Sequence, residues 1–335
     1  SVSGKLHRTL LCCLLVLPLH LQAQLYINEF QASNINTILD YDGNYLQWVE
    51  IYNGGSTTVD LQGYYMSDSL EWPDRCRIMD HVVIPPGGHG LVWLDDPIWV
   101  SCEFRLDMDG EELVLLNPSG EILDYISFPR QYVDVSYGRQ EDGSGEWVYF
   151  DRASPDDHNT GDGLAEPLFA DPVLYSLEGG IYQEYQLLEL SVHSPGAIIR
   201  YTTDGSWPDH SSPEYTAPIS LSGTTLIRAR AFEPGHLHGP VSTRSFIFHE
   251  NSLLPVVSLS SDPYNYFNDR YGMYVEGTNG TLGVCWDEPA NWNRDWERPA
   301  NFEYFLPGGE QVINQLVGTK ISGACSRSIT YKPFS

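Results

Sequence analysis

Apolar and polar residues alternate, with a period of two, through short stretches that glycine- and proline-rich corners separate. Residues 25–36 begin Leu-Tyr-Ile-Asn-Glu-Phe, and residues 46–52 read Leu-Gln-Trp-Val-Glu-Ile-Tyr. This period is typical of a β-strand with one buried face. The corners at 85–88, 117–120 and 142–145 carry the residues that β-turns favour. Short strands at this spacing predict a mostly β chain that forms a β-sandwich.

The composition agrees with this fold class and excludes one class of partner. The 335 residues include 21 Tyr, 12 Phe and 9 Trp together with 30 Gly and 22 Pro, a mixture typical of strands joined by tight turns. A chain of this length predicts two or three domains. Its 18 Lys and Arg against 45 Asp and Glu give a formal charge of −27, which repels nucleic acid at long range. We therefore expect no nucleic-acid partner.

Residues 1–23 predict a secretory signal. Lys5 and Arg8 precede an almost wholly apolar run over 10–21, and Ala23 is a small residue suited to cleavage. The run is too short to span a bilayer comfortably, and no later stretch is long or apolar enough. We expect a protein secreted to the exterior or the cell surface, with no transmembrane segment after cleavage. Because the chain begins without Met and stops within a pattern, we expect a fragment.

Six motifs that follow the predicted signal resemble a bacterial lamin tail domain. They lie at 26–30, 48–53, 59–64, 84–87, 110–115 and 136–139. The resemblance implies an immunoglobulin-like sandwich over 24–159 and a binding or spacing role rather than catalysis. The composition then shifts to Asp, Gly, Pro and Asn, which predicts a linker over 160–171.

A second β unit follows the linker. Residues 196–208 contain the run Tyr-Thr-Thr-Asp-Gly-Ser, and residues 224–232 alternate like a strand paired with 198–201. These motifs resemble the fibronectin-like module at the C-terminus of chitobiases and hexosaminidases, which implies a second sandwich over 172–248. Such modules accompany enzymes without being hydrolases themselves.

The last segment, 254–335, is expected to contain strands at 254–259 and 271–277. Its motifs at 296–305, 318–323 and 326–334 resemble the N-terminal part of CotH-type secreted kinases. The resemblance implies an incomplete α+β kinase-like part, with ATP and Mg²⁺ as cofactors of a complete domain. Because the family's catalytic acids lie further along, we expect this chain to be inactive as a kinase.

Three cations in this segment are candidate nucleotide-binding residues. Lys320, Arg327 and Lys332 supply positive charge in an acidic chain, and glycines at 318 and 323 would let the backbone approach a phosphate. The resemblance places Arg327 and Lys332 in or near the nucleotide cleft. The alternative is a β-hairpin with solvated cations on its outer face.

Other residues suggest ion binding or covalent cross-linking. Two acidic loops, with Asp40 and Asp42 in one and Asp107 and Asp109 in the other, have carboxylates at alternate positions near a glycine and are candidates for weak Ca²⁺ binding; solvated turn residues are the alternative. Export permits a disulfide between Cys76 and Cys102, although two buried thiols would also fit. The spacing of Cys285 and Cys325 matches no metal-binding pattern.

Aromatic and histidine residues of the second module leave further alternatives. Trp207, Tyr201 and Tyr215 would form a sugar-stacking face or pack in the core. His236 and His238 are expected to be exposed loop residues rather than metal ligands.

Two functions remain open from the sequence. One is a secreted protein whose sandwiches bind or position extracellular or cell-surface partners, as a fragment of a CotH-like kinase. The other is an extracellular glycan-binding or adhesion protein without enzymatic activity.

Overall fold

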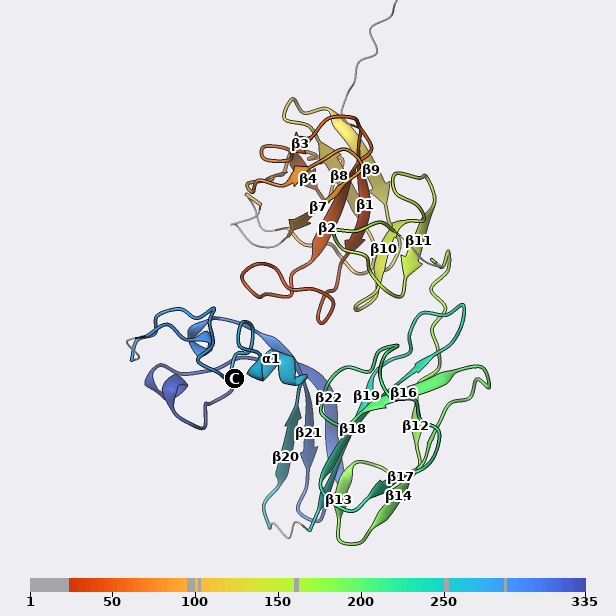
Figure 1. Ribbon diagram of the computed structural model, residues 1–335, viewed down its shortest axis with the longest axis vertical. Helices are drawn as coiled ribbons and strands as arrows, with labels where there is room; N and C mark the ends of the chain where they lie inside the picture. The colour runs from red at the N-terminus through yellow and green to blue at the C-terminus, as the bar shows by residue number, and fades with distance from the viewer. Residues whose placement is uncertain (1–23, 95–99, 102–103, 160–162, 250–252, 286–287) are drawn as a thin grey trace, which may run out of the picture.

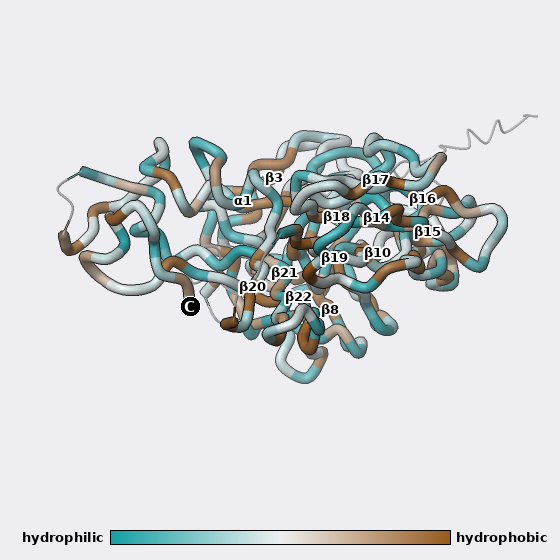
Figure 2. The backbone as a smooth tube through the Cα atoms, turned by 90° about the horizontal axis from the view of Figure 1, so that it is seen from below, coloured by the Kyte–Doolittle hydropathy of each residue, from teal (hydrophilic) through white to brown (hydrophobic). Residues whose placement is uncertain are grey.

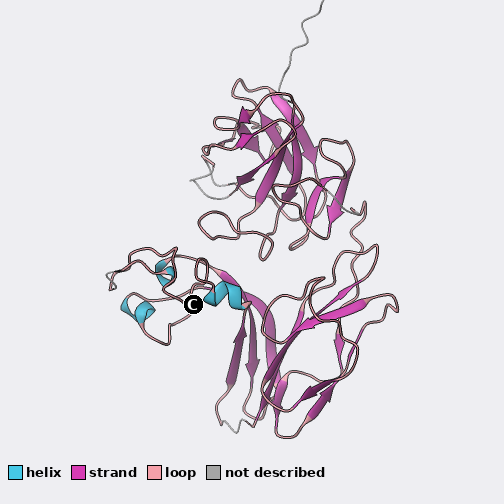
Figure 3. Cartoon of the chain, in the orientation of Figure 1, coloured by secondary structure: helices cyan, strands magenta, loops and turns pink. Residues whose placement is uncertain are grey.

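The computed structural model describes residues 24–94, 100–101, 104–159, 163–249, 253–285 and 288–335. β-Strands dominate these ranges, and only short helices interrupt them (Figure 3). Two β-sandwiches follow one another, and a three-stranded sheet with short helices lies beside the second sandwich (Figure 1). The predicted mostly β fold with tandem sandwiches is confirmed, whereas the kinase-like helical part is not shown among the described residues.

The first sandwich consists of two main sheets and a short strand pair. One sheet has the order β11-β10-β1-β2-β7, the second has the order β5-β4-β8-β9, and β3 pairs with β6. The bounds are β1 Leu25–Gln31, β2 Trp48–Asn53, β3 Val59–Asp60, β4 Tyr65–Ser67, β5 Cys76–Arg77, β6 Val83–Ile84, β7 His89–Trp93, β8 Glu112–Leu116, β9 Ile122–Ser127, β10 Ser136–Arg139 and β11 Trp147–Phe150. Pairing between all neighbouring strands is antiparallel.

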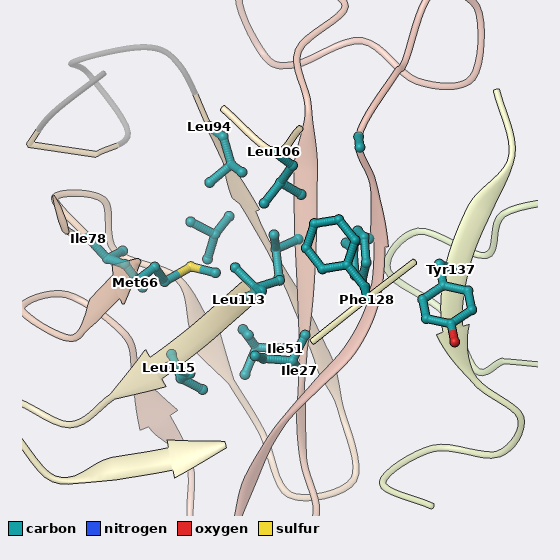
Figure 4. Packing of buried hydrophobic residues seen from close by; sticks show 14 of the residues in the cluster. Ile27, Ile51, Met66, Ile78, Leu94, Leu106, Leu113, Leu115, Phe128 and Tyr137 are labelled. Carbon is teal, nitrogen blue, oxygen red and sulfur yellow. The ribbon is translucent and has the colours of Figure 1, made fainter. Parts of the chain in front are cut away.

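Apolar side chains from both sheets meet between them (Figure 4). Ile27 and Ile51 come from β1 and β2, and Leu113 and Leu115 come from β8 of the facing sheet; all four are fully buried. Burial of one such side chain contributes about 1.5–3 kcal/mol relative to exposure. This packing accounts for the alternation in the sequence, because every second residue of each strand points into the same core.

Polar residues on the other face of the first sheet are buried as well. β1 contains a β-bulge at Asn28, because Ile27 pairs with Ile51 while Glu29 pairs with Glu50. Asn28, Glu29 and Glu50 have no exposed surface. In the chain after β11, the amide and hydroxyl of Ser154 donate to Glu29, and the amide of Asp156 donates to Glu50. The polar half of these strands therefore forms a second, hydrogen-bonded interior.

The chain between the sandwiches is bound to both of them. Leu164 pairs with Tyr149 of the first sandwich, and Phe169 pairs with Leu237 of the second. Phe169 also packs, together with Leu237, against the core of the first sandwich. In its described part, the predicted linker is thus held by backbone pairing and apolar contact.

The second sandwich has a four-stranded sheet of order β13-β19-β18-β16 and two strand pairs, β12-β15 and β14-β17. β13 runs parallel to β19, and the other pairs are antiparallel. The bounds are β12 Leu174–Tyr175, β13 Gly180–Tyr182, β14 Gln186–Leu188, β15 Leu190–Ser191, β16 Ile198–Thr202, β17 Ile219–Leu221, β18 Thr225–Phe232 and β19 Ser242–Phe248. The expected pairing of 198–201 with 224–232 is confirmed as β16 with β18.

The last segment contains an antiparallel sheet of order β20-β21-β22. Its elements are β20 Val256–Ser260, α1 Pro263–Phe267, η1 Asn291–Asn293, β21 Arg298–Phe305, β22 Gln311–Thr319 and η2 Cys325–Ser328. The strand expected at 254–259 is present as β20. The prediction of a strand at 271–277 is wrong. The amides of Met273 and Tyr274 donate hydrogen bonds to the carbonyls of Asn265 and Tyr266 in α1 instead of pairing with a strand.

A turn of the first sandwich contacts this last segment. The carbonyl of Asp42 accepts a 2.8 Å hydrogen bond from Trp296 Nε1, and Arg294 lies 3.4 Å from the Asp42 carboxylate. Gly43 has φ +88°, and a Cβ there would lie 2.9 Å from the ring of Tyr271. This close approach leaves room only for glycine.

Hydrophobic stretches are short and interrupted along the coloured part of the tube in Figure 2. Within the described ranges, no helix has the length and hydropathy needed to cross a bilayer.

Candidate ligand-binding site

The three predicted nucleotide-binding cations already make contacts within the protein. Lys332 Nζ lies 4.1 Å from the ring centroid of Trp292 and donates to the carbonyl of Ile329. Arg327 donates to the carbonyls of Gly323 and Trp292. The structure therefore brings Arg327 and Lys332 together around Trp292. Burial lowers the pKa of Lys332.

Lys320 lies apart from that aromatic contact. Its Nζ is 3.5 Å from a carboxylate oxygen of Asp295 and 3.8 Å from one of Glu297. The alternative of a β-hairpin with solvated cations is met only in part. Ile321 pairs antiparallel with Phe334, but Arg327 lies in the 3-10 helix η2 and Lys332 is buried. Nucleotide binding by the three cations stays a prediction.

The acidic turns use their carboxylates for local hydrogen bonds. Asp40 is almost fully buried and accepts from the backbone and side chain of Asn44, and burial raises its pKa. Asp107 accepts from the amide of Asp109, whose own carboxylate is 85% exposed and 3.9 Å from Arg130. The carboxylate of Asp42 points towards Arg294 of the last segment. Calcium binding at these turns stays a prediction.

The cysteines divide into one pair that is seen and one that stays a prediction. Cys285 and Cys325 form a disulfide within the last segment. The sequence considered them only as metal ligands, so this bond was missed. Cys76 is buried in β5, whereas Cys102 lies outside the described residues. The predicted Cys76–Cys102 bond therefore stays a prediction.

The aromatic candidates of the second module separate into two environments. Tyr201 and Tyr215 contact each other edge to face and pack against the core of the second sandwich. Trp207 instead lies on the outer side of the sheet, next to two arginines. His238 is buried and binds Asp151 of the first sandwich at 2.7 Å, so it is not the exposed loop residue expected.

A pocket of about 800 Å³ lies where the two sandwiches and the last segment meet. We call it the junction pocket. Residues from each part line it, among them Tyr132, Phe169, Trp207, Arg228, Arg230 and Leu316. Its walls therefore combine aromatic and aliphatic surface with cationic groups.

The arginines reach the pocket because of the strand period. Arg228 and Arg230 are two residues apart on β18, so both point away from the core that Ile227, Ala229 and Ala231 help to form. Arg200 of β16 is the direct cross-strand partner of Arg230. None of these three arginines has a carboxylate within 4.0 Å among the described residues.

Hydrogen-bond donors at this surface lack partners. Arg228 donates from its Nη atoms to the carbonyls of Gly205 and Ser260. Across the described chain, however, no partner is found for Nε of Arg228, Nε of Arg230 or Nε1 of Trp207, although all three atoms are buried. A buried donor without a partner costs about 1–3 kcal/mol, and more when the group is charged. Such a cluster indicates an acceptor that binds there.

Both arginines stay charged at neutral pH. Burial lowers the pKa of Arg228 and of Arg230 to about 10, with Asp262 and Asp134, respectively, opposing the shift. The guanidinium carbons lie 5.3 Å and 5.8 Å from the ring centroid of Trp207, which adds a cation–π contact to each. The site can therefore bind an anionic oxygen group through fixed, charged donors.

Sequence reasoning missed these arginines. Their signal was present: Arg228 and Arg230 interrupt the apolar strand Thr225–Phe232 at alternate positions. In a sandwich strand, two charged residues on one face predict that this face leaves the core. The pattern alone does not say which other parts of the chain cover that face.

Two regions of the chain match models of known protein families. The lamin tail domain family model matches residues 21–130, and the chitobiase/beta-hexosaminidase C-terminal domain model matches residues 177–243. Neither match extends into the last segment. No curated protein matches the chain. The crystal structure of Drosophila N-cadherin EC1-3 is 10% identical over 86% of this chain and 91% of that chain, with a TM-score of 0.14. The two family matches fit a binding or structural role for the sandwiches.

Proposed function

We propose that this chain is a secreted binding protein that takes an acidic glycan in the junction pocket. The carrying observation is that Arg228 and Arg230 line this pocket with buried Nε atoms that have no partner among the described residues, in a chain of net charge −27. An isolated buried guanidinium is costly, so a bound anion would lower the free energy of this region. The two sandwiches would hold the pocket in shape.

The chemistry of the pocket favours a sugar acid. Arginine binds carboxylates through two parallel hydrogen bonds, which gives both strength and orientation. Tyr132 and Phe169, whose ring centroids are 4.8 Å apart, supply apolar surface for the carbon–hydrogen faces of a sugar ring. A uronic-acid unit combines these two properties.

Calorimetry with trigalacturonate tests the proposal, with neutral maltotriose as the matched ligand. We expect binding of the uronate alone, and a loss of about 10- to 100-fold in affinity for Arg230→Met, since charged hydrogen bonds contribute about 1.5–3 kcal/mol. Arg270→Met, which removes an exposed arginine outside the pocket, is the control. Equal binding by Arg230→Met and the parent, or equal binding of both sugars, would refute the site.

Secretion belongs to this proposal and rests on the signal pattern of residues 1–23. Mass spectrometry of exported material should show a chain that begins at Gln24. Retention of the uncleaved chain inside the cell would contradict export.

A second candidate function is the nucleotide-binding part of a CotH-like kinase. It rests on the resemblance of 254–335 and on the placement of Arg327 and Lys332 around Trp292. ATP with Mg²⁺ in the same calorimeter separates the two proposals: nucleotide binding that Arg327→Met removes would favour the kinase part. The acidic glycan is preferred, because these two cations already have partners, whereas the buried Nε atoms of Arg228 and Arg230 have none among the described residues.

A further inference from the structure

Two histidines and an aspartate of the first sandwich converge outside the junction pocket. His89 begins β7, Asp142 lies in the turn between β10 and β11, and His158 lies in the segment after β11. One ligand atom from each, His89 Nε2, Asp142 Oδ2 and His158 Nδ1, lies within 4.8 Å of the others. Across the described residues, no other group of three such side chains comes this close.

The buried histidine points at this group without a hydrogen bond. The side chain of His89 is 5% exposed, and its Nε2 lies 3.2 Å from Asp142 Oδ2. The angles at these two atoms do not allow a hydrogen bond, and His89 Nε2 has no other partner among the described residues. Two ligand atoms bound tetrahedrally to one Zn²⁺, with bonds of about 2.0–2.1 Å, lie about 3.3 Å apart. The separation therefore fits a shared metal ion.

The second oxygen of Asp142 is fixed by neighbouring groups. Oδ1 accepts from Asn28 Nδ2 and from the amide of Asn159, each at 3.0 Å. Asn28 is the bulged residue of β1, so the bulge directs its side chain at this carboxylate. Hydrogen bonds of this kind orient metal ligands and leave the other oxygen free to bind.

His158, the third residue of the group, is open to solvent. His158 is 61% exposed, its Nδ1 hydrogen-bonds Asp142 Oδ2, and its ring packs edge-on against that of His89. Entry of a cation would displace the hydrogen shared by His158 and Asp142. Three protein ligands leave one tetrahedral position for water or another ligand.

We propose that His89, Asp142 and His158 form a binding site for a divalent transition-metal ion, with Zn²⁺ as the cation that this ligand set suits. Imidazole nitrogens favour such ions over Mg²⁺ and Ca²⁺, which take oxygen ligands. The negative net charge of the chain also attracts cations. The site joins β7 to the two loops that border the buried glutamates, so the metal would hold these loops together.

Titration calorimetry of the chelator-treated chain with ZnCl₂ tests the site, and MgCl₂ serves as the comparison salt. We expect one equivalent of Zn²⁺, a raised unfolding temperature, and no Mg²⁺ binding. His158→Ala should weaken the affinity by at least about 10-fold, the lower range for perturbed metal sites. Because His158 is exposed, this variant should fold, which far-UV circular dichroism checks.

Three further variants test the location of the metal site. Asp142→Asn should lose Zn²⁺ affinity as His158→Ala does, whereas His81→Ala, at an exposed histidine that pairs with Asp60, should bind as the parent does. His210→Ala probes the other histidine-rich position, beside Asp151. No Zn²⁺ binding, or binding that only His210→Ala removes, would overturn the proposal.

Discussion

Glu29 and Glu50 face each other across β1 and β2 with no exposed surface. Burial, and then the charge of Glu29, raise the pKa of Glu50 to about 8, against the hydrogen bond from Asn28. Burial also raises the pKa of Glu29. Directly opposed like charges destabilise a sheet, so the pair retains a proton near neutral pH.

The free energy of unfolding should therefore fall as the pH rises from about 4.5 to about 8. Over this range the unfolded chain has released the Glu50 proton while the folded chain still holds it. Glu50→Gln should flatten this slope. Urea unfolding at pH 5, 6.5 and 8 with chelator present measures it.

The comparison uses only the slope of unfolding free energy against pH. Glu50→Gln also replaces one carboxylate oxygen with an amide nitrogen, so the hydrogen bond from Asn28 or from the Asp156 amide is lost and the absolute stability changes. Glu310→Gln, at an exposed turn, serves as the control and should keep the slope of the parent. An unchanged slope in Glu50→Gln would show that other groups set the pH dependence.

Among elements, β21 shows how polar contacts attach the last sheet to the second sandwich. Glu303 of β21 is fully buried and accepts from the amide of Ser245 in β19 at 3.0 Å, from the Ser245 hydroxyl, and from Gln311 at 2.6 Å. Asn314 of β22 donates to the carbonyl of Thr243. The sheet is therefore fixed through hydrogen bonds to the neighbouring strand.

Glu303→Ala should lower the free energy of unfolding by about 1–3 kcal/mol, because the Ser245 amide would stay buried without its acceptor. Chemical denaturation compares this variant with Glu310→Ala, which alters an exposed turn of the same segment. Equal stability of both variants would contradict the role assigned to Glu303.

Over the whole molecule, Asp151 connects the two sandwiches. It follows β11 and binds His238 at 2.7 Å and His210 at 3.2 Å, both in the second sandwich. Burial alone would raise the pKa of Asp151, but the hydrogen bonds and the electrostatic interaction with His238, together with the hydrogen bond from His210, outweigh burial and lower the pKa to about 2. The contact therefore stabilises the junction above pH 3.8, the ordinary pKa, and is lost as the pH falls towards 2.

Asp151→Asn should loosen the junction at neutral pH, because it removes the charge that holds the two histidines. We expect a larger radius of gyration in small-angle X-ray scattering and weaker binding of the uronate in the junction pocket. Asp74→Asn, at an exposed aspartate of the first sandwich, is the control. If Asp151→Asn scatters as the control does, Asp151 does not hold the sandwiches together.

Prediction from the sequence succeeded where the signal was local. Strands such as 224–232 were found because alternation with a period of two is visible within a few residues. The strand expected at 271–277 failed because its apolar residues pack on α1 and its amides bond there. Only the packing against α1 distinguishes this irregular segment from the expected strand.

The sequence by itself determined the mostly β class, the sandwich modules and the acidic character of the chain, since each follows from neighbouring residues or from their sum. Tertiary structure alone decided the junction pocket, the Cys285–Cys325 bond and the convergence of His89 with Asp142 and His158. These sites join residues far apart in the chain. Their proximity depends on strand order, a bulge and contacts between modules, which no local period of side chains encodes.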